Sequence, residues 1–114
     1  MRVKSLNAWL ALACLALPAL SSAESGGHIR VLAASCAACH GTDGNSVGGT
    51  PVLAGLDRTH FILQMQAFRS GERSSTVMHH HAKGLTPDEI EQLAGYFSAQ
   101  PRSIGTSPLP LGAL

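Results

Sequence analysis

Two cysteines and a histidine within residues 35–41, Cys36, Cys39 and His40, form the pattern C-x-x-C-H. Thiols three positions apart can form thioethers with the two vinyl groups of one haem, and the next histidine then lies beneath the iron. The pattern predicts one haem c attached through Cys36 and Cys39, with His40 as proximal ligand. The second axial ligand must come from further along the chain, and Met78 is the best candidate.

Two other interpretations of the cysteine pair stay open at this point. A thioredoxin-like redox pair requires a βαβ context, and the chain shows no strand-like alternation of apolar and polar residues. A zinc site normally needs a second pair of ligands. No second cysteine pair follows, but three consecutive histidines, His79, His80 and His81, could complete a Cys2His2 site without haem.

The first 23 residues have the organisation of a secretory signal peptide. A basic start is followed by an apolar run from Leu6 to Leu20 and by the small residues Ser21-Ser22-Ala23. We expect cleavage after Ala23 and export to the periplasm, with no membrane span retained. Retention of the run as an anchor is the alternative, and lipidation of Cys14 is a weaker one.

Charge and size restrict what the exported part of the chain can be. Two of the 8 Lys and Arg residues precede Ala23, so the remainder carries more acidic than basic side chains. No basic stripe is present, which gives no support to nucleic-acid binding. A domain of this size often needs a metal or a covalent staple, so a haem would form part of its core.

The exported chain divides into three predicted helices joined by two irregular segments. Residues 24–27 are expected to form a frayed leader, and 28–38 an amphipathic helix that presents Ile29, Leu32, Ala33 and Cys36 on one face. Glycines and a proline make 41–55 a loop. A second helix is predicted over 59–70, capped by Asp57 or Thr59 and ended by Gly71. Its apolar face comprises Phe61, Ile62, Met65 and Phe68, so Met65 is expected in the core rather than on iron.

Residues 71–84 are expected to be irregular and to carry Met78 on a loop. The third helix opens with Thr86 as N-cap, Pro87 at the first position and Glu89 completing a capping box. Its buried face is expected to contain Ile90, Leu93, Ala94 and Phe97. Pro101 ends the globular part, so we assign residues 24–101 to one domain and 102–114 to an irregular tail.

These motifs together resemble the class I c-type cytochromes over about residues 27–100. The resemblance rests on Cys39-His40-Gly41, Gly44-Asn45-Ser46, Pro51-Val52-Leu53-Ala54-Gly55, the segments 64–68 and 70–73, and Met78. They recur in small periplasmic cytochromes, in dihaem cytochromes and in the cytochrome subunit of flavocytochrome c sulfide dehydrogenase. Thr76-Val77-Met78 and Ala82-Lys83-Gly84 look most like the last of these.

The resemblance implies an all-α fold in which three main helices and their loops wrap around one covalent haem. It implies that His40 and Met78 are the iron ligands and that the Pro51 carbonyl accepts the Nδ1–H of His40. Arg73 would lie near a haem propionate or be an exposed charge. The row His79, His80 and His81 departs from the pattern: it is a solvated loop, a rival iron ligand or a contact for another metal or partner.

The implied function is one-electron transfer in the periplasm rather than catalysis. With both axial positions filled by protein, no substrate reaches the iron, and no catalytic group of acid–base or nucleophilic type stands out. Redox proteins are the expected partners, and a flavoprotein is the partner if the chain is a subunit of a sulfide dehydrogenase. A haem sensor or peroxidase with a labile sixth ligand is the alternative of another class. The sequence leaves the oligomeric state open.

Overall fold

A computed structural model describes residues 21–103, with side chains from residue 25 onward. Its helices are α1 (Ser21–His40), the 3₁₀ turn η1 (Thr42–Gly44), α2 (Arg58–Ser70), α3 (Met78–Gly84) and α4 (Pro87–Ser98). Over this range no strand occurs, which confirms the all-α prediction. The predicted signal peptide and Cys14 lie almost wholly outside the described residues, as does the tail beyond Ser103.

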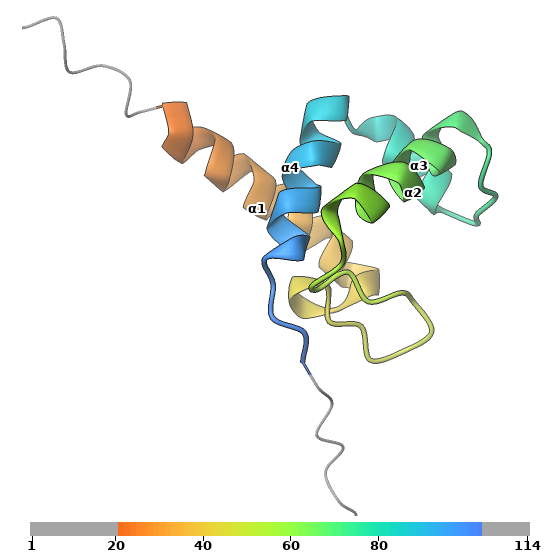
Figure 1. The fold of residues 1–114 in the computed structure, drawn as a ribbon, viewed down its shortest axis with the longest axis horizontal. Helices are drawn as coiled ribbons and strands as arrows, with labels where there is room; N and C mark the ends of the chain where they lie inside the picture. Colours follow the sequence, from red (N-terminus) through yellow and green to blue (C-terminus); the bar gives the residue numbers. More distant parts are fainter. Residues whose placement is uncertain (1–20, 104–114) are drawn as a thin grey trace, which may run out of the picture.

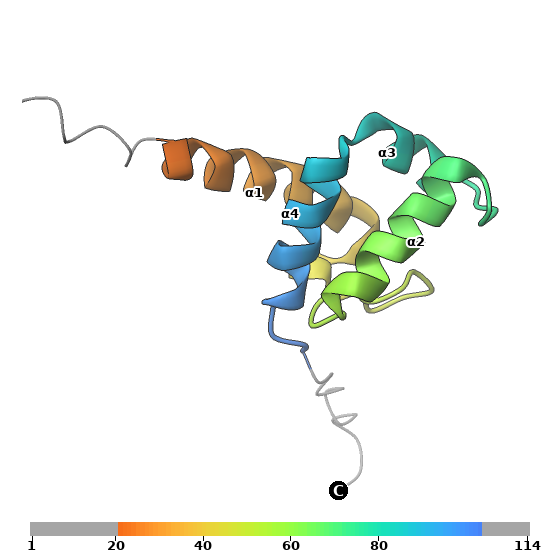
Figure 2. The same ribbon diagram turned by 45° about the horizontal axis from the view of Figure 1, so that its top comes forward.

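Helix α4 lies at the centre of the arrangement. It packs against both α1 and α2, and α3 packs against α2 (Figures 1 and 2). The side chains predicted to be buried on α4 are Ile90, Leu93, Ala94 and Phe97, and all four are no more than 2% exposed. Phe97 stacks on Phe61 of α2, with ring centroids 5.8 Å apart. The core therefore lies where α4 crosses its two neighbours.

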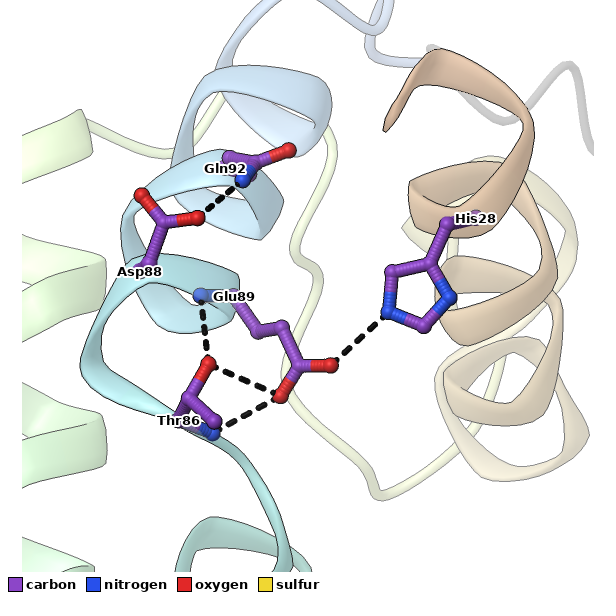
Figure 3. Close-up of polar contacts among 5 residues, drawn as sticks. All are labelled: His28, Thr86, Asp88, Glu89 and Gln92. Carbon is purple, nitrogen blue, oxygen red and sulfur yellow. Dashed lines mark hydrogen bonds and ion pairs between the residues drawn. The ribbon is translucent and has the colours of Figure 1, made fainter. Parts of the chain in front are cut away.

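The start of α4 is fixed by the capping box that the sequence predicted. Thr86 Oγ1 accepts a hydrogen bond from the Glu89 N–H at 3.2 Å, and the Thr86 N–H donates to Glu89 Oε2 at 2.7 Å (Figure 3). The same carboxylate is 2.8 Å from His28 Nε2 on α1. Glu89 thus satisfies a helix end and joins α1 to α4.

Helix α2 has the ends that its sequence predicts. Of the two candidate caps, Asp57 acts: its side chain accepts from the His60 N–H at 2.8 Å. Gly71 ends the helix in the left-handed conformation, with φ of +86°. On its inner face Phe61, Met65 and Phe68 are buried, as expected for a core stripe.

Residues 24–27 and 78–84 were predicted to be irregular but are helical, so these predictions were wrong, whereas residues 71–77 are irregular as predicted. Residues 24–27 belong to α1, whose first turns project away from the other helices (Figures 1 and 2). Gly26 and Gly27 weaken a helix by about 1 kcal/mol each but keep its backbone hydrogen bonds. Met78 begins the seven-residue helix α3 rather than lying on a loop.

Tertiary contacts stabilise α3 despite its weak sequence signal. Ala82 is fully buried against the core. The His79 N–H donates to Ser75 Oγ at 2.9 Å, which supports the first turn. Arg69 of α2 donates to the carbonyl of Leu85, just past the helix end. The partners in these contacts lie outside α3, so the sequence pattern of α3 does not reveal them.

Among residues 21–103, none of the helices combines the length and apolarity that crossing a membrane requires. At the other end of this range, the start of the tail lies against the domain. Asn45 Nδ2 donates to the Pro101 carbonyl at 3.1 Å, and the Ser103 N–H donates to Asn45 Oδ1 at 2.7 Å.

Candidate haem site

The last turns of α1 bring the motif to the wall of a cavity. Cys36 is half-buried and Cys39 is exposed, and both are free thiols lining this cavity. Residues three apart on a helix are neighbours on its surface, so the two thiols face the same space. Burial is the main cause that raises the pKa of the Cys36 thiol, against the lowering effect of its hydrogen bonds.

His40 has a defined orientation and a defined free nitrogen. Its side chain is 7% exposed, and Nδ1 lies 2.7 Å from the carbonyl oxygen of Pro51. A carbonyl oxygen only accepts, so Nδ1 must carry the proton and donate. The lone pair of a neutral ring is then on Nε2, the nitrogen left for a metal. The contact that the resemblance implied between His40 and Pro51 is thus present.

The loop carrying Pro51 is fastened to the motif and to itself. Thr50 Oγ1 donates to the carbonyl of Cys39 at 2.5 Å. The Gly44 carbonyl accepts from the N–H groups of Leu53 at 2.8 Å and Ala54 at 3.1 Å. These bonds, one from the short Thr50 side chain and two between backbone groups, hold the Pro51 carbonyl beside His40.

The cavity has a volume of about 600 Å³. Helix α3 contributes Met78 and His81, and α2 contributes Phe61, Met65 and Phe68. Further lining residues are Leu32, Leu53, Leu56, Leu85 and Leu93, which make most of the wall apolar. Arg73 also lines it, with its guanidinium 4.6 Å from the Phe68 ring centroid and bonded to Gln64 Oε1.

These residues fit a haem. Two thiols, an imidazole with a free Nε2 and a thioether border one apolar cavity of the size typical of small-ligand and cofactor sites. Met65 borders the cavity too, although it is buried in the core stripe where it was predicted. The sequence interpretation did not assign His60 or select His81, which also line it. A helix starting at Met78 would have placed His81, three positions on, beside Met78.

The zinc alternative finds no support in this geometry. No group of three or more histidine, cysteine or acidic side chains suited to a metal ion occurs in the described part of the chain. The thioredoxin-like alternative fails because it requires strands, which residues 21–103 lack.

The sequence model of the family described as "Cytochrome c" matches residues 29–100, which is more than half of the chain. The chain belongs to the cytochrome c family. Covalent haem c is therefore its cofactor, and Cys36 and Cys39 have the spacing that attachment requires. The resemblance to class I c-type cytochromes is confirmed.

Several curated proteins are similar to this cytochrome. The cytochrome subunit of sulfide dehydrogenase from Chlorobaculum tepidum is 47% identical over 74 residues, covering 65% of this chain and 66% of that protein. A thiosulfate dehydrogenase electron acceptor from Thiomonas intermedia is 41% identical over 83 residues, covering 71% and 38%. Cytochrome c-554(548) from Halomonas halodenitrificans is 36% identical over 70 residues, covering 58% and 84%. The match thus spans just under two thirds of the first relative and about two fifths of the second.

Proposed function

We propose that this cytochrome carries electrons with a haem bound through Cys36 and Cys39 and ligated axially by His40 and Met78. The observation that supports this most is the single cavity bordered by the end of α1 and the start of α3. When bound, haem supplies an iron that exchanges one electron between ferrous and ferric states. With two protein ligands in place, the chain leaves no position for a substrate.

The roles of the protein groups follow from their contacts. Pro51 orients the His40 ring and keeps its proton on Nδ1, so that Nε2 faces the metal. Met78 is set in place by α3, which the fully buried Ala82 fastens to the core. Arg73 supplies a positive charge at the cavity wall, where a haem propionate would find it.

Visible spectroscopy of protein exported in a host that matures c-type cytochromes tests this assignment. We expect a denatured haemochrome that retains its haem, and a ferric form with the far-red sulfur-to-iron band. The band should vanish in Met78→Ala and persist in Met65→Leu, the matched control for the other methionine at the cavity. Loss of the band in Met65→Leu would instead place Met65 on the iron.

A further outcome concerns the sixth ligand. Carbon monoxide binding to the ferrous wild type at neutral pH would show that Met78 leaves the iron readily, which favours a sensor or peroxidase over a carrier. Haem that is released on denaturation would refute attachment through Cys36 and Cys39.

We further infer export to the periplasm with cleavage after Ala23, on the strength of the basic start, apolar run and small residues. The mass of the protein recovered from the periplasm measures the cleavage position. A mass that includes residues 1–23, or membrane-bound protein with lipid on Cys14, would refute it.

A narrower candidate is that this cytochrome accepts electrons from a dehydrogenase of reduced sulfur compounds, with a flavoprotein as donor. Its support is that two relatives are named as the cytochrome subunit of a sulfide dehydrogenase and as the electron acceptor of a thiosulfate dehydrogenase. Stopped-flow mixing with the reduced flavoprotein subunit of a sulfide dehydrogenase should give haem reduction that saturates with flavoprotein concentration. Equal rates with a flavoprotein that has no cytochrome partner would refute specific docking.

A further inference from the structure

The three consecutive histidines of α3 have different surroundings. Only His81 lines the haem cavity, whereas His79 and His80 do not. His79 is engaged elsewhere, with Nδ1 3.1 Å from Ser75 Oγ. The rings of His79 and His80 lie against each other, with centroids 3.9 Å apart. The structure therefore distinguishes His81 from the two neighbouring histidines, which the sequence alone could not do.

His81 is placed beside Met78 by the period of the helix. The two residues are three positions apart in α3, and side chains at this spacing have Cβ atoms about 5–6 Å apart on one helix face. Both line the same cavity. A rotation of about 60° with a shift of about 4.5 Å along the helix axis would bring His81 to the position of Met78.

Helix α3 is also the element best suited to such a movement. It has seven residues, and its N-cap Val77 supplies no side-chain hydrogen bond. The imidazole of His81 is exposed, and no hydrogen bond from it occurs within residues 21–103. His81 therefore has no polar partner to give up when it turns toward the cavity.

The two other spare donors at the cavity lie on a longer helix. Met65 is 6% exposed and forms part of the core stripe of α2. His60 lies in the first turn of α2, where its N–H is bonded to the Asp57 cap. The backbone that carries both residues belongs to α2, a helix of 13 residues that packs against both α3 and α4.

We propose that His81 is the reserve axial ligand of this cytochrome, binding the haem iron when the Met78 thioether is absent. This inference rests on the His40 and Met78 ligation proposed above. Imidazole is a good donor to iron and is harder than a thioether, so the exchange would favour the ferric state and lower the reduction potential.

The test uses exported holoprotein and the electron paramagnetic resonance and visible spectra of its ferric form. Met78→Ala should lose the far-red band yet stay low-spin, with a reduction potential below that of the wild type. Met78→Ala/His81→Ala should become high-spin and bind added imidazole, and after reduction its ferrous form should bind carbon monoxide. Met78→Leu, alone and with His81→Ala, keeps the side-chain volume and replaces the alanine variants if these do not accumulate.

Matched double variants identify the ligand. Met78→Ala combined with His79→Ala, His80→Ala or His60→Ala should stay low-spin. High-spin Met78→Ala, or a His81 double variant that stays low-spin, would refute the reserve-ligand role while leaving the His40 and Met78 assignment intact. A wild type without the far-red band would refute both.

Discussion

Gly44→Ala tests whether the loop that carries Pro51 requires a residue without a Cβ at position 44. Gly44 is buried with φ of +77°, a conformation that strains residues with a Cβ. A Cβ there would lie 2.8 Å from Leu53 Cβ, 2.9 Å from the Ala54 nitrogen and 2.9 Å from Phe97 Cδ1. None of these atoms is the far end of a flexible side chain, so the backbone itself must shift.

The expected loss combines two costs. The left-handed conformation costs a non-glycine residue about 1–2 kcal/mol. Overpacking a tight site costs about 1–3 kcal/mol. Gly44→Ala should therefore lower the free energy of unfolding by about 2–5 kcal/mol. For a domain of this size that corresponds to a fall in Tm of about 8 °C or more.

Denaturant unfolding of the holoprotein, followed by far-ultraviolet circular dichroism, measures the loss, and two other glycines separate the costs. Gly71 has φ of +86°, but a Cβ at this position would meet no atom within 4 Å, so Gly71→Ala should cost about 1–2 kcal/mol. Gly48 has neither feature, and Gly48→Ala should change stability by less than about 0.5 kcal/mol. A Gly44→Ala loss no larger than that of Gly71→Ala would refute the packing argument.

Three other changes test the core and the two groups with shifted pKa values. Leu93 is fully buried, so Leu93→Ala should cost about 2–5 kcal/mol in chemical unfolding, against less than about 0.5 kcal/mol for exposed Leu63→Ala. The Thr86 backbone N–H, and then the contact with His28, lower the pKa of Glu89. Its stabilising effect is thus present above the ordinary glutamate pKa and lost as pH falls through the lowered value, so the stability gap between wild type and Glu89→Gln should shrink in acid. An unchanged gap in acid would refute this. Burial, and then the hydrogen bond to Asp43, raise the pKa of Tyr96. In an absorbance titration of this single tyrosine, Asp43→Asn should therefore lower its pKa, and no change would contradict the contact.

The parts of the fold that the sequence predicted correctly are those with local signals. The caps of α2 and α4 are formed by residues within a few positions of the helix ends, as at Asp57 and Thr86. The missed helix α3 depends on Ala82 in the core and on Arg69 from another helix. No window of seven residues contains that information, because it lies in the packing.

The candidate site divides in the same way. The thiols and His40 are adjacent in sequence, so their chemistry and spacing were readable directly. The preference for Met78 over Met65 came from the apolar stripe of α2, in which Met65 is buried as predicted, although both methionines border the cavity. The sequence also did not single out His81. Because α3 was not predicted, the three consecutive histidines could not be assigned to different faces of a helix.

The His40 side and the Met78 side of the cavity differ in the number of hydrogen bonds that fasten them. On the His40 side, Tyr96 donates to Asp43 at 3.0 Å and Asn45 bonds the backbone on either side of Arg102. Arg102 Nε in turn donates to the Ala54 carbonyl at 3.2 Å, so the loop carrying Pro51 is fastened to α4 and to the chain that follows it.

Among residues 21–103, fewer hydrogen bonds fasten the Met78 side: Ser75 bonds His79, and Arg69 bonds the carbonyl just beyond the helix end, while the buried Ala82 packs against the core. A carrier needs both ligands fixed, so that little rearranges when an electron arrives. We therefore expect substitutions on the Met78 side to change the reduction potential of the haem most readily. It is also the side on which the proposed reserve ligand, His81, lies within one helical turn of Met78.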